Sequence, residues 1–192
     1  LLRRPFPEGW KAILEGQVPF YRRLRPELRP SFHDKLKVFV WEKSFFGAGD
    51  LAVTEEKKVV IGAAAVRLIL FLDLSHYDRL KEIVIYPGAY QRPKDAGAGA
   101  FLGEAHTFGT VVLSWPAVQQ GLRDECDGHE TAAHEFAHIL DRGNDFFDGT
   151  PRLRASEHYR PWAQAMSEHF LKLQAGALRE RLVLRGYGAK NE

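Results

Sequence analysis

Apolar side chains recur every three to four positions over several stretches of this chain, which is the spacing that one face of an α-helix produces. One such stretch follows Thr54, Glu55 and Glu56. This is a typical helix start, because the hydroxyl can cap free amides and the helix dipole favours acids in the first turn. The pattern predicts helices over residues 8–24, from Ser31 to about 47, and over 54–72, 117–122, 128–142, 159–174 and 177–184.

Two stretches rich in β-branched and aromatic residues predict strands. Residues 82–86 read Glu-Ile-Val-Ile-Tyr and are followed by Pro-Gly, and residues 107–115 are closed by Pro116. Residues 51–53 predict a short strand or extended piece, whereas 91–106 is rich in Gly, Ala and Pro and predicts a long surface loop. The helices are not spaced for a parallel βαβ series, so we expect an α+β fold with a small mixed sheet.

Composition narrows the class of protein. The chain has 192 residues, 45% of them hydrophobic and 27% charged, which is typical of a single globular domain, here spanning 1–192. A net charge of +2 is too small to favour direct nucleic-acid binding. The longest apolar run, Val59–Leu72, contains Arg67 and is shorter than the roughly 20 residues that cross a membrane. Cys126 is the only cysteine, so we expect no intrachain disulfide and a reducing, cytoplasmic location.

The most informative motif is His134-Glu135-Phe136-Ala137-His138. Histidines four positions apart lie one helical turn from each other on one face, where both imidazoles can bind the same zinc ion. Glu135 lies between them and would act as the general base that takes a proton from water. Asp127 and Glu130 have the spacing of a helix-start signal. Because the motif helix is apolar nearly all round, we expect it to be buried; the alternative interpretation is two core histidines with hydrogen-bond partners.

Asp141 follows His138 by three positions and lies on roughly the same helix face. Its carboxylate is a candidate to orient a ligand imidazole by a hydrogen bond from outside the metal shell. The alternative is an acid at the end of the helix with a solvent or loop partner.

A catalytic zinc needs a third protein ligand. A metzincin would have Gly and His at the third and sixth positions after His138, where this chain has Asp141 and Asn144, so that class is excluded. A ligand from a later helix remains, and the spacing does not choose among Glu157, His158, Glu168 and His169.

The predicted strand 107–115 comes directly before the motif helix. In zinc peptidases an edge strand beside the active helix holds the substrate as an added strand, by main-chain hydrogen bonds. We therefore expect Val111, Leu113 and Trp115 to lie on a substrate-binding edge, with an ordinary core strand as the alternative.

Several further segments, together with the motif, carry a family resemblance over nearly the whole chain. They are Arg4-Pro5-Phe6-Pro7, Val18-Pro19-Phe20-Tyr21, Glu42-Lys43-Ser44-Phe45, Ile85-Tyr86-Pro87-Gly88, Val111-Val112-Leu113-Ser114-Trp115, Leu140-Asp141 and Asp148-Gly149-Thr150-Pro151. With these segments the chain resembles the Mlc titration factor A family of zinc-dependent peptidases. The resemblance implies a zincin-like, gluzincin-type fold and an aminopeptidase-like activity on peptide or protein substrates.

The resemblance also implies further site residues and a partner. It aligns Tyr187 with a family tyrosine whose phenol would stabilise the oxyanion of the reaction. The family's third ligand is a glutamate in an Asn-Pro-Ala-Glu-Phe-Phe-like segment, which aligns two positions past Glu192, so we expect the sequence to stop just short of it. An alternative function is regulatory: a binding protein that sequesters the Mlc repressor of sugar uptake, with the metal site inactive or structural.

Overall fold

The computed structural model describes residues 3–90, 102–105, 109–123, 130–141, 153 and 155–175. Its α-helices are α1 (Glu8–Gln17), α2 (Pro19–Arg23), α3 (Arg29–Glu42), α4 (Glu55–Leu68), α5 (Trp115–Arg123), α6 (Thr131–Asp141) and α7 (Tyr159–Gln174). Short 3₁₀ turns are η1 (Pro26–Leu28), η2 (Leu74–Tyr77) and η4 (Ser156–His158). The strands are β1 (Ser44–Gly47), β2 (Glu82–Tyr86), β3 (Gly103–Ala105) and β4 (Thr110–Ser114).

The four strands form one mixed sheet in the order β1-β2-β4-β3. The strands β1, β2 and β4 are parallel to one another, and β3 is antiparallel to β4. The predicted α+β class with a small mixed sheet is confirmed. No series of βαβ units is present among the described residues, as expected, but β1, α4 and β2 form one such unit, which was not predicted. Its first strand has only four residues and directly follows α3, so the helical pattern concealed it.

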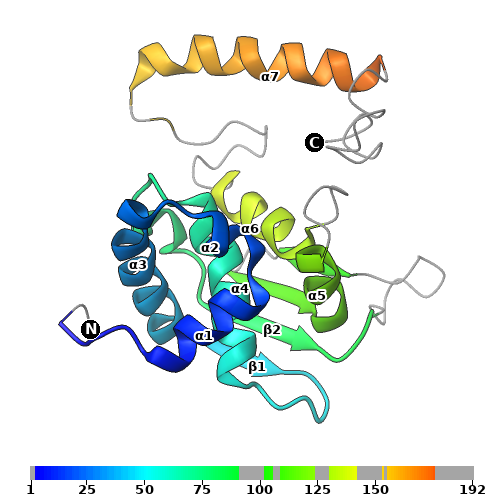
Figure 1. The fold of residues 1–192 in the computed structure, drawn as a ribbon. Coiled ribbons are helices and arrows are strands. Elements are labelled where there is room, and N and C mark those ends of the chain that lie inside the picture. Colours follow the sequence, from blue (N-terminus) through cyan, green and yellow to red (C-terminus); the bar gives the residue numbers. More distant parts are fainter. Residues whose placement is uncertain are drawn as a thin grey trace.

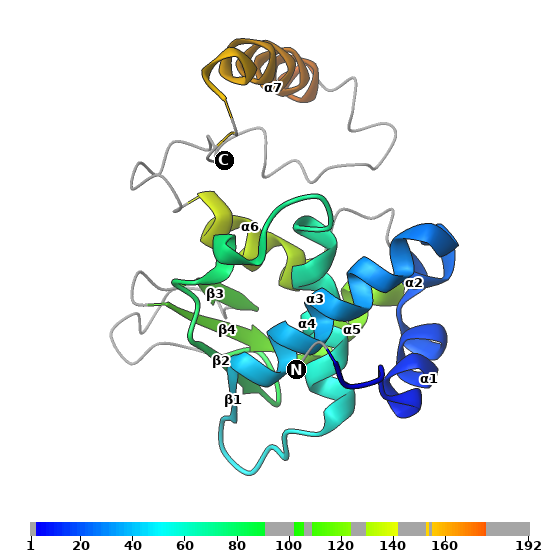
Figure 2. The same ribbon diagram turned by 90° about the vertical axis from the view of Figure 1, so that its left-hand side faces the viewer.

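Helices α1, α3, α4 and α5 lie on one face of this sheet (Figure 2). Helix α4 is central, with Val59 to Val66 all buried. A Cβ added at Gly62 would lie 2.8 Å from the Cδ1 atom of Leu36 and 3.1 Å from the Cγ2 atom of Val40. The missing side chain therefore lets α3 and α4 pack closely.

Both ends of α4 are capped by side chains. The Thr54 hydroxyl accepts a hydrogen bond from the Lys57 amide at 3.3 Å, which confirms the predicted cap. At the other end the ammonium group of Lys35 donates to the carbonyl oxygens of Ile69, Leu70 and Leu72, at 2.8, 2.8 and 2.6 Å. These carbonyls follow the last residue of α4, so the lysine fixes the turn after the helix. Within the last turn of α4, the Tyr77 hydroxyl donates to the Ala65 carbonyl oxygen at 3.0 Å.

Other boundaries differ from the expectations. The helix predicted over 8–24 is divided at Val18, because Pro19 begins α2. Residues 51–53 are irregular, and 103–105 form a strand inside the predicted loop. The strand over 82–86 and the helix over 159–174 lie where they were predicted. The helix predicted over 177–184 falls outside the described residues.

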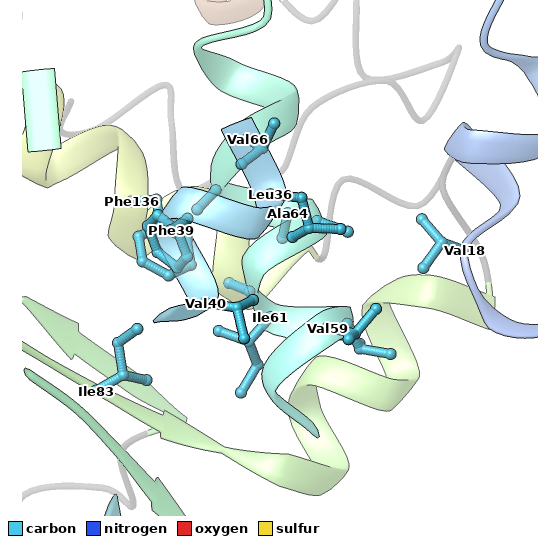
Figure 3. Close-up of a cluster of buried hydrophobic side chains, with 14 of the residues drawn as sticks. Val18, Leu36, Phe39, Val40, Val59, Ile61, Ala64, Val66, Ile83 and Phe136 are labelled. Atoms are coloured by element: carbon cyan, nitrogen blue, oxygen red, sulfur yellow. The ribbon is translucent and has the colours of Figure 1, made fainter. Parts of the chain in front are cut away.

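The core lies between the helices and the sheet. In register across the sheet, Ile83 pairs with Val111 and Ile85 with Leu113, and all four side chains are fully buried. Figure 3 shows Phe136 of α6 beside Phe39 of α3 in this core. The two rings pack edge to face, with their centroids 5.8 Å apart. Among the described helices, none has the length and apolar character needed to cross a lipid bilayer.

Candidate metal and peptidase site

The motif helix α6 is buried on one side only. Ala132, Phe136 and Ile139 face the core, whereas His134 is exposed and His138 is partly exposed. The Phe136 ring also contacts the Tyr77 ring, with centroids 5.9 Å apart, and this contact joins α6 to η2. The expectations of a helix buried all round and of two core histidines are therefore wrong. The histidines lie on the accessible side of α6, and the opposite side of this helix packs against the core.

The two imidazoles converge. The Nε2 atom of His134 lies 3.1 Å from the Nε2 atom of His138, and the rings are nearly perpendicular, with centroids 4.5 Å apart. One turn of helix brings the rings together, and their rotamers direct the same nitrogen of each ring at a shared point.

This spacing fits a shared zinc ion. A tetrahedral zinc with Zn–N bonds of about 2.0–2.1 Å holds two ligand nitrogens about 3.3 Å apart. Among the described residues no group of three or more His, Cys, Asp or Glu side chains could hold a metal ion. The described part of the chain therefore provides two converging donors and no third.

Glu135 has different surroundings from its two histidine neighbours. Its side chain is only 7% exposed and lies between α6 and strand β3. The approach is so close that a Cβ placed on Gly103 of β3 would lie 2.7 Å from the Glu135 Oε1 atom. The carboxylate thus lies at the border between helix and sheet, sheltered from bulk water.

Comparison with known proteins identifies the family. A model of the family described as glucose-regulated metallo-peptidase M90 matches residues 1–192. The chain belongs to this family. It is also similar to the "Uncharacterized protein slr2042" of Synechocystis sp., at 34% identity over 203 residues that cover 100% of this chain and 74% of that protein. The resemblance to the Mlc titration factor A family is thereby confirmed, and the family is one of metallopeptidases.

In this member of the M90 family, the strand expected to bind substrate is not at the edge of the sheet. Strand β4, which carries Val111 and Leu113, lies between β2 and β3 and is hydrogen-bonded to both. Trp115 is the first residue of α5. The expectation of an edge strand here is wrong, because β3 was concealed in a Gly- and Ala-rich stretch. In the described sheet β3 is the edge strand next to α6.

Asp141 lies at the end of α6, where the sequence placed it. Its Oδ1 atom is buried and has no hydrogen-bond partner among the described residues, so this oxygen does not orient either imidazole. The proposed role of Asp141 beside the metal shell remains a prediction.

None of the remaining predicted residues that the structure describes completes a metal site with the two histidines. Tyr187, Asp127, Asn191 and Glu192 lie outside the described residues. The candidate ligands Glu157, His158, Glu168 and His169 belong to η4 and α7. Helix α7 lies apart from α6 in both views (Figures 1 and 2), and Glu168 forms an ion pair with Lys172 at 2.5 Å.

An ion pair at the start of α6 was missed by the sequence analysis. The Arg67 guanidinium of α4 donates to the Glu130 carboxylate at 2.6 Å, and both side chains are partly buried. Burial raises the pKa of the Glu130 carboxyl, and the charge of Arg67 acts in the opposite direction. Arg67 also lies over the Phe20 ring at 5.0 Å. The available signal was a single arginine inside an apolar run, which needs a partner when it is buried.

Proposed function

We propose that this chain is the catalytic domain of a zinc-dependent peptidase that acts on peptide or protein substrates. The observation that carries the proposal is the 3.1 Å separation of the His134 and His138 Nε2 atoms, with Glu135 between them in sequence. Two neutral imidazole nitrogens at this distance fit the donor set of a catalytic zinc, and membership of the M90 family supports a metallopeptidase.

His134 and His138 would hold the ion through Nε2. When bound, zinc polarises a substrate carbonyl and lowers the pKa of its water toward neutrality. The Glu135 carboxylate would take a proton from the attacking water and deliver it to the leaving amine. Its shelter between α6 and β3 suits this role, because a fixed and partly desolvated base needs little reorganisation during the reaction.

The edge strand β3 offers a place for the peptide to bind. A substrate that adds to β3 as a further strand would lie beside the Glu135 carboxylate, which contacts Gly103 of β3. This proposal transfers to β3 the role expected for Val111, Leu113 and Trp115.

Finer points belong to the same proposal. The Tyr187 phenol would stabilise the oxyanion, as the family resemblance implies. The activity would be aminopeptidase-like, and the protein would act in the cytoplasm.

The proposal is tested by substituting Glu135→Gln in the full-length protein. We expect the variant to retain zinc, because both imidazoles remain, and to lose turnover by about 10²- to 10⁴-fold, because the base is gone. Zinc is measured by elemental analysis and turnover with chromogenic amino-acid anilides and a peptide library. Glu8→Gln, at the exposed start of α1, is the matched control and should hydrolyse like the wild type.

Two results would overturn the proposal. Unchanged hydrolysis by the Glu135→Gln variant would show that another group acts as the base. Stoichiometric zinc without hydrolysis of any library peptide would instead favour the regulatory alternative, in which the protein sequesters a repressor such as Mlc.

A further inference from the structure

Strand β3 and helix α6 approach each other at Gly103. A Cβ built on Gly103 would lie 2.7 Å from the Oε1 atom and 2.8 Å from the Cγ atom of Glu135, and 2.9 Å from the Cγ2 atom of Thr131. All three separations are below 3.0 Å, a distance at which something must move. Any residue other than glycine at this position would therefore displace a neighbour.

The two neighbours differ in their ability to move. Thr131 and Glu135 are one turn apart on the same face of α6, and both are 7% exposed. The Thr131 side chain is β-branched, so its rotamer in a helix is restricted. Glu135 has more rotatable bonds, and the group displaced most easily would be the Glu135 carboxylate.

The backbone of Gly103 does not itself require glycine. Among the described residues the glycines with positive φ are Gly49 and Gly109, so the conformation of Gly103 is one that other residues adopt. The requirement at position 103 comes from the approach to α6. Gly103 also pairs with Leu113 of β4, and this pairing fixes the position of Gly103 along the axis of α6.

We propose that Gly103 is a positioning residue for Glu135. The space left by the missing side chain of Gly103 and the Cγ2 methyl of Thr131 together hold the Glu135 side chain in one rotamer, with its carboxylate against strand β3. This inference rests on the proposed peptidase function, in which Glu135 is the general base. It assigns to Gly103 no contact with the substrate or the metal.

The first test is the variant Gly103→Ala in the full-length, zinc-loaded protein. We expect kcat to fall on the order of tenfold to a hundredfold, since misplacement of a catalytic group by about 1 Å has an effect of this size. KM should stay within about twofold and the zinc content should not change, because the three atoms nearest the added methyl group belong to Glu135 and Thr131 and not to a ligand imidazole. Gly88→Ala is the control, since a Cβ there meets nothing within 4 Å.

A second substitution separates positioning from general damage to the fold. In the Gly103→Ala background, Thr131→Ser removes the Cγ2 methyl that limits the space and should restore part of kcat. Thr131→Val keeps a methyl at that place and should restore none. A loss of kcat that neither variant relieves, or that follows the melting temperature across the series, would overturn the proposal.

A third readout does not depend on activity. Crystal structures of the metal-free wild type and of Gly103→Ala should show the Glu135 carboxylate in different rotamers. Superposition of the two carboxylates would overturn the positioning role. This comparison decides the inference even if the wild-type protein hydrolyses no peptide, in which case the proposed function fails separately.

Discussion

His134 and Glu135 are neighbours in sequence, but they meet different surroundings. Successive residues on a helix point about 100° apart, so His134 faces solvent while Glu135 faces strand β3. An accessible histidine can capture an ion from solution, and a sheltered carboxylate keeps one position. One turn of α6 thus provides both an accessible metal ligand and a fixed carboxylate, and the proposed chemistry requires both.

A different histidine, His33, should make stability depend on pH. Its ring stacks on Phe6 with centroids 3.8 Å apart, and its Nε2 atom lies 2.8 Å from the Tyr21 hydroxyl oxygen. Burial lowers the pKa of His33, and the positive charge of Arg29 lowers it further. Lys11 and Lys37 act in the same direction, and Asp34 opposes them. The folded protein therefore favours the neutral ring.

The sign follows from the proton balance. With a lower pKa in the folded state, the unfolded chain binds more protons, so the His33 contribution is complete above a pH of about 6.5 and is lost as the pH falls through the folded value. The free energy of unfolding, measured with urea between about pH 5 and 8, should decrease more steeply with falling pH for the wild type than for His33→Gln. Parallel curves would contradict this prediction.

At the level of elements, the Arg67–Glu130 pair joins the last turn of α4 to the start of α6, next to the proposed site. In a double-mutant cycle of Arg67→Met and Glu130→Gln, urea unfolding should give a coupling of about 1–3 kcal/mol, as for hydrogen bonds to charged groups. Arg25→Met, which breaks an exposed pair with Glu27, should have little effect.

The same pair has a predictable pH response. Burial favours the protonated form of Glu130, and loss of Arg67 removes the charge that opposes this. The folded Arg67→Met variant should therefore bind more protons than its unfolded chain above a pH of about 4.5, so its deficit in stability should grow as the pH rises toward neutrality. A deficit that is constant from about pH 4.5 to 7 would contradict this expectation.

Local patterns identified the elements that local interactions determine. The alternation in 82–86, the cap at Thr54 and the motif helix needed no tertiary information. Strands β1 and β3, with four and three residues, lack such patterns, and pairing with β2 and β4 makes them strands. For the same reason the histidine pair could be predicted from spacing, but the contact between Gly103 and Glu135 could not.

At the level of the whole molecule, the helical layer on one face of the sheet and α6 beside β3 share a continuous core, which reaches from Trp10 to Ile139. Helix α7 differs from these helices, because none of its described side chains is buried. Apolar side chains such as Met166, Phe170 and Leu171 are exposed on it. Burial in a shared core is therefore what distinguishes the α4 and α6 helices from α7.

Hydrogen exchange should reveal this difference. Backbone amides in α7 should exchange orders of magnitude faster than those in α4, since a helix with few buried contacts opens locally at low free-energy cost. Mass spectrometry of the 192-residue chain would measure both helices in one experiment. Equal protection of α7 and α4 would contradict the prediction and would mean that something covers α7.

The attachment of α6 through Phe136, on the side away from the histidines, has one more consequence. Apolar contacts with Phe39 and Tyr77 hold the helix whether or not an ion is present. Folding would then not depend on zinc binding, unlike in small zinc-dependent domains that unfold when a chelator removes the metal. Removal of a bound ion by a chelator should therefore leave α6 in place and the melting temperature of the core nearly unchanged.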